Sequence, residues 1–290
     1  MRLRTLLLPG LLASIGWMHS AHAAESYTTC TNTVSSTPTT ISTSGTWCMK
    51  GNLTTANTTV HAITVAADDV TIDCNNFELR ETAGAATKAI AIYSKDHSRT
   101  TIRNCNIQGF EHGIYLIATT ASSGGGHLVE NNHAEGNTVT GIRVEGDGSV
   151  VRHNLVFDTG GSTVTGIVST YGIYTNWSVG VSDNTVTGVL GDGANGSAFG
   201  IYAVGVSNGA IVENRLRNIV GDGTGKAMGV KVLATGRSAI RDNDLFGDAA
   251  TGSIGVYCVS STSRAKDNII DGFVTGKQGC GDAGDNDVSH

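Results

Sequence analysis

A short phrase recurs along the chain at intervals close to 25 residues, and it constrains the fold more than any other feature. Each copy has an apolar residue, two variable residues and a closing residue, and the steps between closing residues run from 22 to 30 residues. Those closing residues are Asn75, Cys105, Asn132, Asn154, Asn184, Asn214, Asn243 and Asn268. Such a period is typical of solenoids, because one repeat cannot bury its own apolar face and must share a core with its neighbours.

A second phrase precedes the closing residue in the later copies. It reads GIYL (113–116), GIRV (141–144), GIYT (172–175), GIYA (200–203), GVKV (229–232) and GVYC (255–258), with AIAI (89–92) as a weaker first copy. The alternation of period two predicts strands rather than helices. The positions expected to face inward are Ile114, Leu116, Ile142, Val144, Ile173, Ile201, Val230 and Val256. The residues before the glycines are expected to form a further core stack, namely Thr140, Tyr171, Phe199, Met228 and Ile254.

The closing asparagines have a physical reason to recur at one corner of a stacked coil. Asparagine tolerates left-handed backbone geometry, and its side-chain amide pairs with identical amides above and below. Cys105 interrupts the column, and Cys74 lies beside Asn75 one coil below, so adjacency of the coils predicts a Cys74–Cys105 disulfide. Closeness in sequence suggests two further disulfides, Cys30–Cys48 and Cys258–Cys280. Neither the cysteines nor the histidines have the spacing of a metal site, and we predict no metal.

These patterns predict one all-β domain, a single-stranded right-handed parallel β-helix of about eight coils. The segment WCMKGNL…AITV…DDVTIDCN resembles the first coil of secreted bacterial β-helix repeat proteins of the pectate-lyase-like superfamily. The resemblance runs from about Thr46 to Phe273 and implies the fold, because this superfamily includes lyases, hydrolases, epimerases and proteins without activity. We expect a capping segment at 24–50, the β-helix at 51–273 and an irregular polar tail at 274–290.

The first residues, MRLRTLLLPGLLASIGWMHSAHA, are typical of a secretory signal peptide spanning 1–23. A membrane anchor is the alternative, but the apolar stretch is too short and contains Pro9 and Gly10, so we predict no membrane span. An even number of six cysteines also suits an exported chain, and we expect the protein to be secreted or periplasmic. The formal net charge of −6 argues against a nucleic-acid partner.

One stripe of outward positions carries the functional prediction. If the residues after each glycine face inward, the next residues form an exposed column of Tyr115, Arg143, Tyr174, Tyr202, Lys231 and Tyr257. A second outward column contains Ile117, Glu145, Asn176, Val204, Leu233 and Val259. Tyrosine rings pack on sugar faces, and arginine or lysine binds carboxylates, so the first column suits an acidic polysaccharide. The alternative is that the same rings and cations only stabilise an exposed sheet by packing on one another.

The sequence leaves two functions open. The first is a protein that binds an acidic polysaccharide, whether or not it also cleaves it. Cleavage would proceed by β-elimination, with Arg143 beside Tyr174, or Tyr202 beside Lys231, as the reacting pair. That chemistry requires a base with a lowered pKa. Hydrolysis is less supported, because Glu145 is the single carboxylate at the outward strand positions. The second is a non-catalytic extracellular adhesion or surface solenoid. We assign no catalytic residue and no cofactor.

Overall fold

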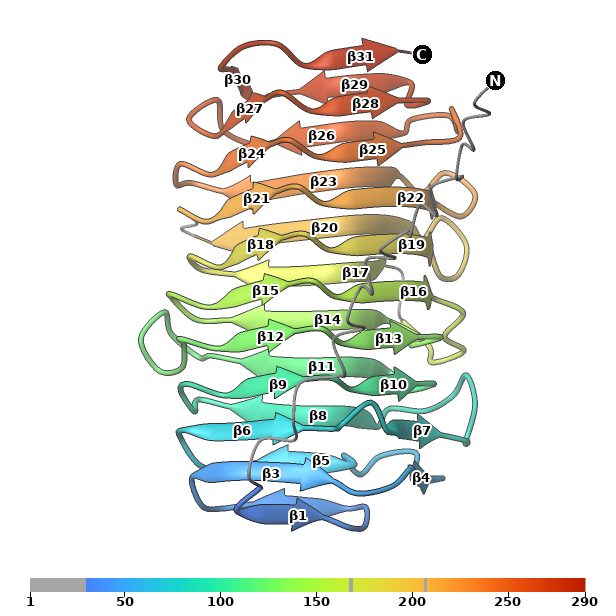
Figure 1. Ribbon diagram of the computed structural model, residues 1–290. Helices are drawn as coiled ribbons and strands as arrows, with labels where there is room; N and C mark the ends of the chain where they lie inside the picture. Colours follow the sequence, from blue (N-terminus) through green and yellow to red (C-terminus); the bar gives the residue numbers. More distant parts are fainter. Residues whose placement is uncertain (1–29, 167–168, 206–207, 290) are drawn as a thin grey trace, which may run out of the picture.

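Three parallel β-sheets run the length of the molecule, and the chain visits them in turn (Figure 1). The computed structural model describes residues 30–166, 169–205 and 208–289. They form a right-handed parallel β-solenoid of about eight turns without helices, which confirms the predicted fold. The expected signal peptide and residues 24–29 lie outside the described residues. None of the described segments forms a helix with the length and apolar character needed to span a bilayer.

The sheets are named A, B and C. Sheet A contains β1 (Asn32–Val34), β3 (Gly45–Met49), β6 (Val70–Asp73), β9 (Thr101–Arg103), β12 (Leu128–Glu130), β15 (Val150–Arg152), β18 (Gly180–Ser182), β21 (Ala210–Val212), β24 (Ala239–Arg241), β27 (Arg264–Lys266) and β30 (Gly281–Asp282). Sheet B contains β2 (Thr39–Ile41), β5 (Ile63–Val65), β8 (Ile90–Lys95), β11 (His112–Ile117), β14 (Thr140–Glu145), β17 (Ser169–Asn176), β20 (Ser197–Gly205), β23 (Ala227–Ala234), β26 (Ile254–Cys258) and β29 (Thr275–Gln278). Sheet C contains β4 (Leu53–Thr55), β7 (Glu78–Glu81), β10 (Asn106–Gln108), β13 (His133–Glu135), β16 (Leu155–Thr159), β19 (Thr185–Leu190), β22 (Arg215–Val220), β25 (Asp244–Phe246), β28 (Ile269–Asp271) and β31 (Asp287–Ser289).

The predicted inward positions of sheet B form the core. Ile114, Leu116, Ile142, Val144, Ile173, Ile201, Val230 and Val256 are all fully buried. Their register confirms the alignment of the repeats, since Ile173 pairs with Ile201 and Ile201 with Val230. One continuous cluster of apolar side chains therefore extends through the stacked coils, as expected when each repeat shares its core with its neighbours.

The closing asparagines form a buried ladder at the turn between sheets A and C. The side-chain oxygen of Asn184 accepts hydrogen bonds from the backbone N–H and the amide of Asn154, each at 3.0 Å. The Asn184 amide in turn donates to Asn214 at 3.0 Å. The same arrangement repeats from Asn132 to Asn286, and Asn286 is a member that the repeated phrase does not predict. The left-handed backbone falls on the residue before each ladder asparagine from Asn132 to Asn268, such as Asp183 with φ 56° and Glu213 with φ 57°. Asn75 is itself left-handed at φ 51°, but it lies outside the ladder and its amide donates to the Met49 carbonyl.

The geometry of the ladder explains where the left-handed residues lie. To form the ladder, each asparagine must turn its side chain into the solenoid. The Asn184 amide there donates to the carbonyls of Val151 at 3.0 Å and Ser182 at 2.9 Å. The chain reverses at the preceding, outward residue, which therefore takes the left-handed conformation.

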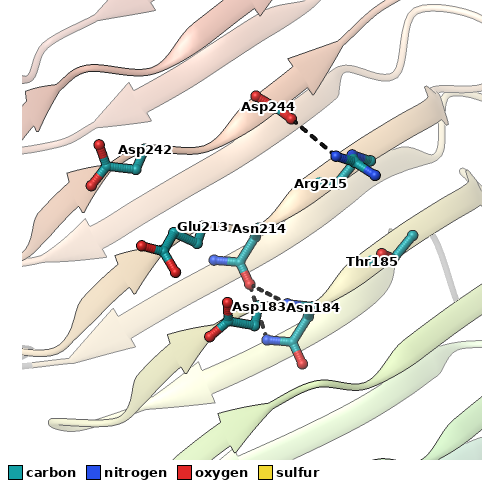
Figure 2. A pocket seen from close by; sticks show the side chains of 8 residues that line it. All are labelled: Asp183, Asn184, Thr185, Glu213, Asn214, Arg215, Asp242 and Asp244. Atoms are coloured by element: carbon teal, nitrogen blue, oxygen red, sulfur yellow. Dashed lines mark hydrogen bonds and ion pairs between the residues drawn. The ribbon is translucent and has the colours of Figure 1, made fainter. Parts of the chain in front are cut away.

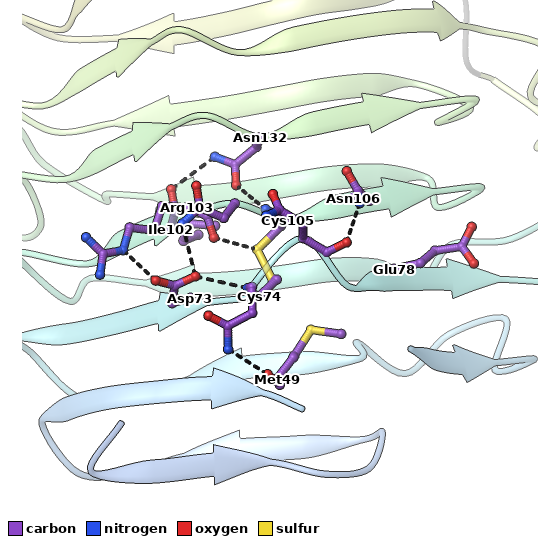
Figure 3. Close-up of a disulfide and its surroundings, with 12 residues drawn as sticks. Met49, Asp73, Cys74, Glu78, Ile102, Arg103, Cys105, Asn106 and Asn132 are labelled. Carbon is purple, nitrogen blue, oxygen red and sulfur yellow. Dashed lines mark hydrogen bonds and ion pairs between the residues drawn. A yellow bond between two sulfur atoms is a disulfide. The ribbon is translucent and has the colours of Figure 1, made fainter. Parts of the chain in front are cut away.

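All three predicted disulfides are present: Cys30–Cys48, Cys74–Cys105 and Cys258–Cys280. Cys74–Cys105 links two coils at the base of the asparagine ladder, where the Cys105 N–H donates to Asn132 (Figure 3). Three disulfides are typical of proteins outside the reducing cytosol and indicate an extracellular or periplasmic environment.

Both ends of the chain differ from a simple cap and tail. The described part of the expected capping segment, from Cys30 on, contributes β1, β2 and β3 to sheets A and B. The last residues are not irregular, because β29, β30 and β31 pair in register with β26, β27 and β28. Asn286 extends the ladder into this last coil, so the same side-chain pairing that orders the repeats also orders the end of the chain.

Candidate functional site

The six residues of the first predicted column lie side by side on the outer surface of sheet B. Backbone pairing joins Tyr115 to Arg143, Arg143 to Tyr174, Tyr174 to Tyr202, Tyr202 to Lys231 and Lys231 to Tyr257. All six side chains are half-buried. We call this set the aromatic column. Since adjacent strands lie about 4.8 Å apart, it presents four tyrosine rings and two cations in one row along the solenoid axis.

The column begins one coil earlier than the sequence indicated. Tyr93 pairs with Tyr115, and their ring centroids are 6.0 Å apart. The copy of the phrase in this coil is therefore AIYS (91–94), not AIAI (89–92). The two segments overlap by two residues. Tyr93, which follows Ile92 as Tyr115 follows Ile114, is the sequence feature that identifies the correct copy.

The residues before the glycines do not join the main core as expected. Phe199, Met228 and Ile254 are buried, but they form a second apolar cluster that packs against Tyr171, Tyr202 and Tyr257 of the outer face. The reason lies in the glycines. A Cβ on Gly200 would overlap the core side chain of Leu216, so the glycine itself occupies an inward position. The residue before it therefore faces outward.

The side chains of this second cluster pack against the rings of the aromatic column. Tyr171 stacks on Phe199 with centroids 5.3 Å apart and planes 14° apart, and Phe199 lies 5.0 Å from the Tyr202 ring. The Lys231 ammonium lies over these rings, 4.8 Å from the centroid of Phe199 and 5.0 Å from that of Tyr202. Within the described residues no carboxylate forms an ion pair with Lys231, so its charge faces aromatic rings and solvent.

Arg143 belongs to the column, but its charge is already paired. Its guanidinium lies between the rings of Tyr115 and Tyr174, 4.8 and 4.2 Å from their centroids. Its Nε donates to Glu145 at 2.7 Å, and its Nη2 also contacts that carboxylate. Glu145 is 3% exposed, so the pair is held within the surface rather than presented to solvent. Arg143 thus shares its charge with Glu145, while its role in substrate binding stays a prediction.

The titration of the tyrosines in the column opposes a role for them in proton abstraction. Burial raises the pKa of Tyr174 to about 12. Burial likewise raises the pKa of Tyr115 and Tyr202, and that of Tyr93 as well. A phenol acting as a base requires the opposite shift. These tyrosines are neutral donors and ring surfaces at neutral pH.

Two neutral histidines flank the first tyrosines of the column. The ring of His61 lies 4.5 Å from Tyr93, and that of His112 lies 4.6 Å from Tyr115. Burial lowers the pKa of His112 to about 3, helped by the charge of Arg143, and burial also lowers the pKa of His61. At neutral pH this end of the face therefore carries no net charge from its histidines.

A second surface, at the turn between sheets A and C, has a different character (Figure 2). A cavity of about 350 Å³ is lined there by the acidic turn residues Asp183, Glu213 and Asp242, beside the asparagine ladder. Arg215 and Asp244 form an ion pair of 3.5 Å at its edge. No group of three or more histidine, cysteine or acidic side chains in the described chain is arranged to hold a metal ion.

No protein-family model matches the chain, and no curated protein matches it. Among solved structures, the A-module of the mannuronan C-5 epimerase AlgE6 from Azotobacter vinelandii matches 84% of this chain and 82% of its own, with a TM-score of 0.35 and 13% identity. The A-module of AlgE4 from the same organism matches 85% and 83%, with a TM-score of 0.32 and 15% identity. The catalytic domain of Agl-KA matches 84% of this chain and 62% of its own, with a TM-score of 0.32 and 13% identity. Likeness at this level transfers no activity.

Proposed function

We propose that the outer face of sheet B binds an acidic polysaccharide laid along the solenoid axis. The observation that carries the proposal is the register-aligned aromatic column, whose half-buried rings lie beside the cation of Lys231. Tyrosine presents a flat apolar face with a polar tip, which suits the alternating apolar and hydroxyl surfaces of a sugar. A repeating ligand is matched by a repeating row of rings.

The charge of the ligand follows from the strands that carry the column. β17, β20, β23 and β26 contain Lys231 and no aspartate or glutamate. A cation without an ion-pair partner, held over aromatic rings, favours a ligand that supplies the missing carboxylate. Burial and the nearby charge of Lys226 lower the pKa of Lys231, so a carboxylate close to it would also relieve an unfavourable environment.

Binding without cleavage is the form of the function that this face supports best. The raised pKa values of the tyrosines count against a tyrosine base, and the pairing of Arg143 with Glu145 counts against Arg143 as the cation that neutralises the sugar carboxylate. The protein then acts as a non-catalytic binding solenoid, and the disulfides and predicted signal peptide support a secreted or periplasmic location.

Affinity electrophoresis tests the proposal with gels that contain pectate, alginate or a glycosaminoglycan. We expect the wild-type protein to be retarded by at least one of these polymers, and Tyr202→Ala to weaken retention about tenfold, as for loss of one stacked ring. Phe157→Ala removes a half-exposed ring from sheet C and is the matched control, which should bind like the wild type. Circular dichroism confirms that each variant folds.

Three results separate the alternatives. No retention of the wild-type protein by any acidic polymer would overturn the proposal. Equal loss for Phe157→Ala and Tyr202→Ala would show that the aromatic column is not the site. Release of unsaturated uronate, detected by its ultraviolet absorbance, would show cleavage and refute the non-catalytic form of the proposal.

A further inference from the structure

The second outward column gives the sheet B face an apolar margin that the proposed function does not use. Val204 and Leu233 are paired neighbours, and Val259 continues the column in the next coil, where its N–H donates to Val232. Leu233 is 41% exposed and Val259 53% exposed. Each is two residues beyond a member of the aromatic column and so faces the same side of the sheet.

A polyuronate without apolar substituents would fit this margin poorly. Such a polymer carries a carboxylate on every sugar, whereas the strands under the margin carry one cation, Lys231, in three coils. The remaining margin positions would place carboxylates against exposed valine and leucine side chains, which do not replace the lost hydration. A ligand with fewer charges and with apolar substituents fits the surface better.

Asn176 indicates the chemistry of the substituent. It pairs with Val204 in the same column, one coil below. Its side-chain oxygen accepts the N–H of Trp177 at 3.0 Å, while no hydrogen bond from its amide nitrogen is present in the described structure. The margin thus places an amide donor about 4.8 Å from the first of three aliphatic side chains. The Trp177 indole lies against Gly205, next to Val204, and adds to the apolar wall.

We propose that the margin of Asn176, Val204, Leu233 and Val259 binds O-acetyl esters on the polysaccharide that lies on the aromatic column. The Asn176 amide donates to an ester carbonyl, and the aliphatic side chains cover the acetyl methyls. The inference rests on the proposed function, and it specifies the substrate class as a partly acetylated acidic polysaccharide. Burying one methyl strengthens binding about fourfold, so two or three occupied positions give a preference of tenfold or more.

The test compares one acetylated acidic polysaccharide with the same polymer after removal of its esters by mild alkali. We expect the wild-type protein to bind the acetylated form at least tenfold more tightly. Leu233→Asn and Val259→Thr change the polarity of the margin at nearly constant size, and each should reduce this preference about fourfold without weakening binding to the deacetylated polymer. Asn176→Ala should reduce the preference as well.

Leu190→Asn is the matched control, because Leu190 is equally exposed at 50% but lies on sheet C. It should keep the full preference. Equal binding of both polymer forms by the wild-type protein would overturn the acetyl proposal while leaving the polysaccharide proposal intact. An undiminished preference in Leu233→Asn would overturn it too.

Failure of the underlying function has a different signature. In that case the wild-type protein binds neither polymer form, and Tyr202→Ala does not change binding. Concentration-dependent dimerisation that Leu233→Asn abolishes, without any polymer preference, would assign the margin to a second copy of the chain and refute the ester site. Tight binding of alkali-treated polymers that contain 6-deoxy sugars, but not of those that lack them, would assign the margin to sugar methyl groups. That result would also refute the ester site.

Discussion

Replacing Asn184 by alanine tests how much the asparagine ladder contributes to stability. Asn184 is 1% exposed, and five hydrogen bonds involve its side chain, with Asn154, Asn214, Val151 and Ser182 as partners. The alanine variant leaves the buried N–H of Asn154 without its acceptor, which costs about 1–3 kcal/mol. Loss of the remaining bonds adds about 1 kcal/mol for each amide hydrogen. We expect the free energy of unfolding to fall by about 3–5 kcal/mol.

Denaturation in guanidinium chloride, followed by tryptophan fluorescence, measures this loss. Thr185→Ala is the matched control, because Thr185 follows Asn184 in the same turn but is half-exposed, and its effect should stay within about 0.5 kcal/mol. Asn184→Asp keeps an acceptor for Asn154 but turns a buried carboxylate oxygen toward the carbonyls of Val151 and Ser182, so it should destabilise at least as much as Asn184→Ala. A loss below about 1 kcal/mol for Asn184→Ala would refute the reasoning, because an unpaired buried N–H alone costs that much.

Three further predictions concern the turns and the buried histidine. In a Cys74→Ala background, Cys105→Asn should recover about 1–2 kcal/mol of unfolding free energy relative to Cys105→Ala, because asparagine extends the ladder; equal denaturation midpoints would contradict this. Glu213 is left-handed at φ 57°, so Glu213→Gly should raise the unfolding free energy by about 1 kcal/mol, and an unchanged or lower thermal midpoint would argue against strain there. Burial lowers the pKa of His127 to about 4. The unfolded chain then binds the extra proton below pH about 6.5, and the stability due to neutral His127 is lost as the pH falls toward 4, by about 2 kcal/mol between pH 7 and pH 5. His127→Asn should flatten this part of the pH profile, whereas replacing the exposed His153 should not.

The fold and the aromatic column follow from patterns that one sequence displays. Alternation in the GIY phrases determines which residues are buried, and the closing asparagines determine the register. Together they place Tyr174 beside Tyr202 before any coordinates are known. Cys105 was informative because it interrupts the column at a position where a neighbouring cysteine, Cys74, lies one coil away.

Other features depend on details that hydropathy does not encode. The sequence pattern places Phe199 in the main core, because Gly200 has no side chain to reveal that it occupies the inward position itself. The commitment of Arg143 to Glu145 depends on side-chain rotamers, since residues two apart on a strand share a face whether or not they pair. The raised pKa of Tyr174 depends on how deeply its ring is buried. The sequence therefore predicts the column from Tyr115 to Tyr257, but not Tyr93, nor the ionisation and hydrogen-bond partners of the members.

Hydroxyl-radical footprinting with a bound acidic polysaccharide is the most direct test of the central claim. The account predicts that Tyr174, Tyr202 and Tyr257 become protected from oxidation, while Phe157 on sheet C keeps the reactivity it has in the free protein. Protection of Phe157 with unchanged reactivity of the three tyrosines would contradict the claim that sheet B is the binding face.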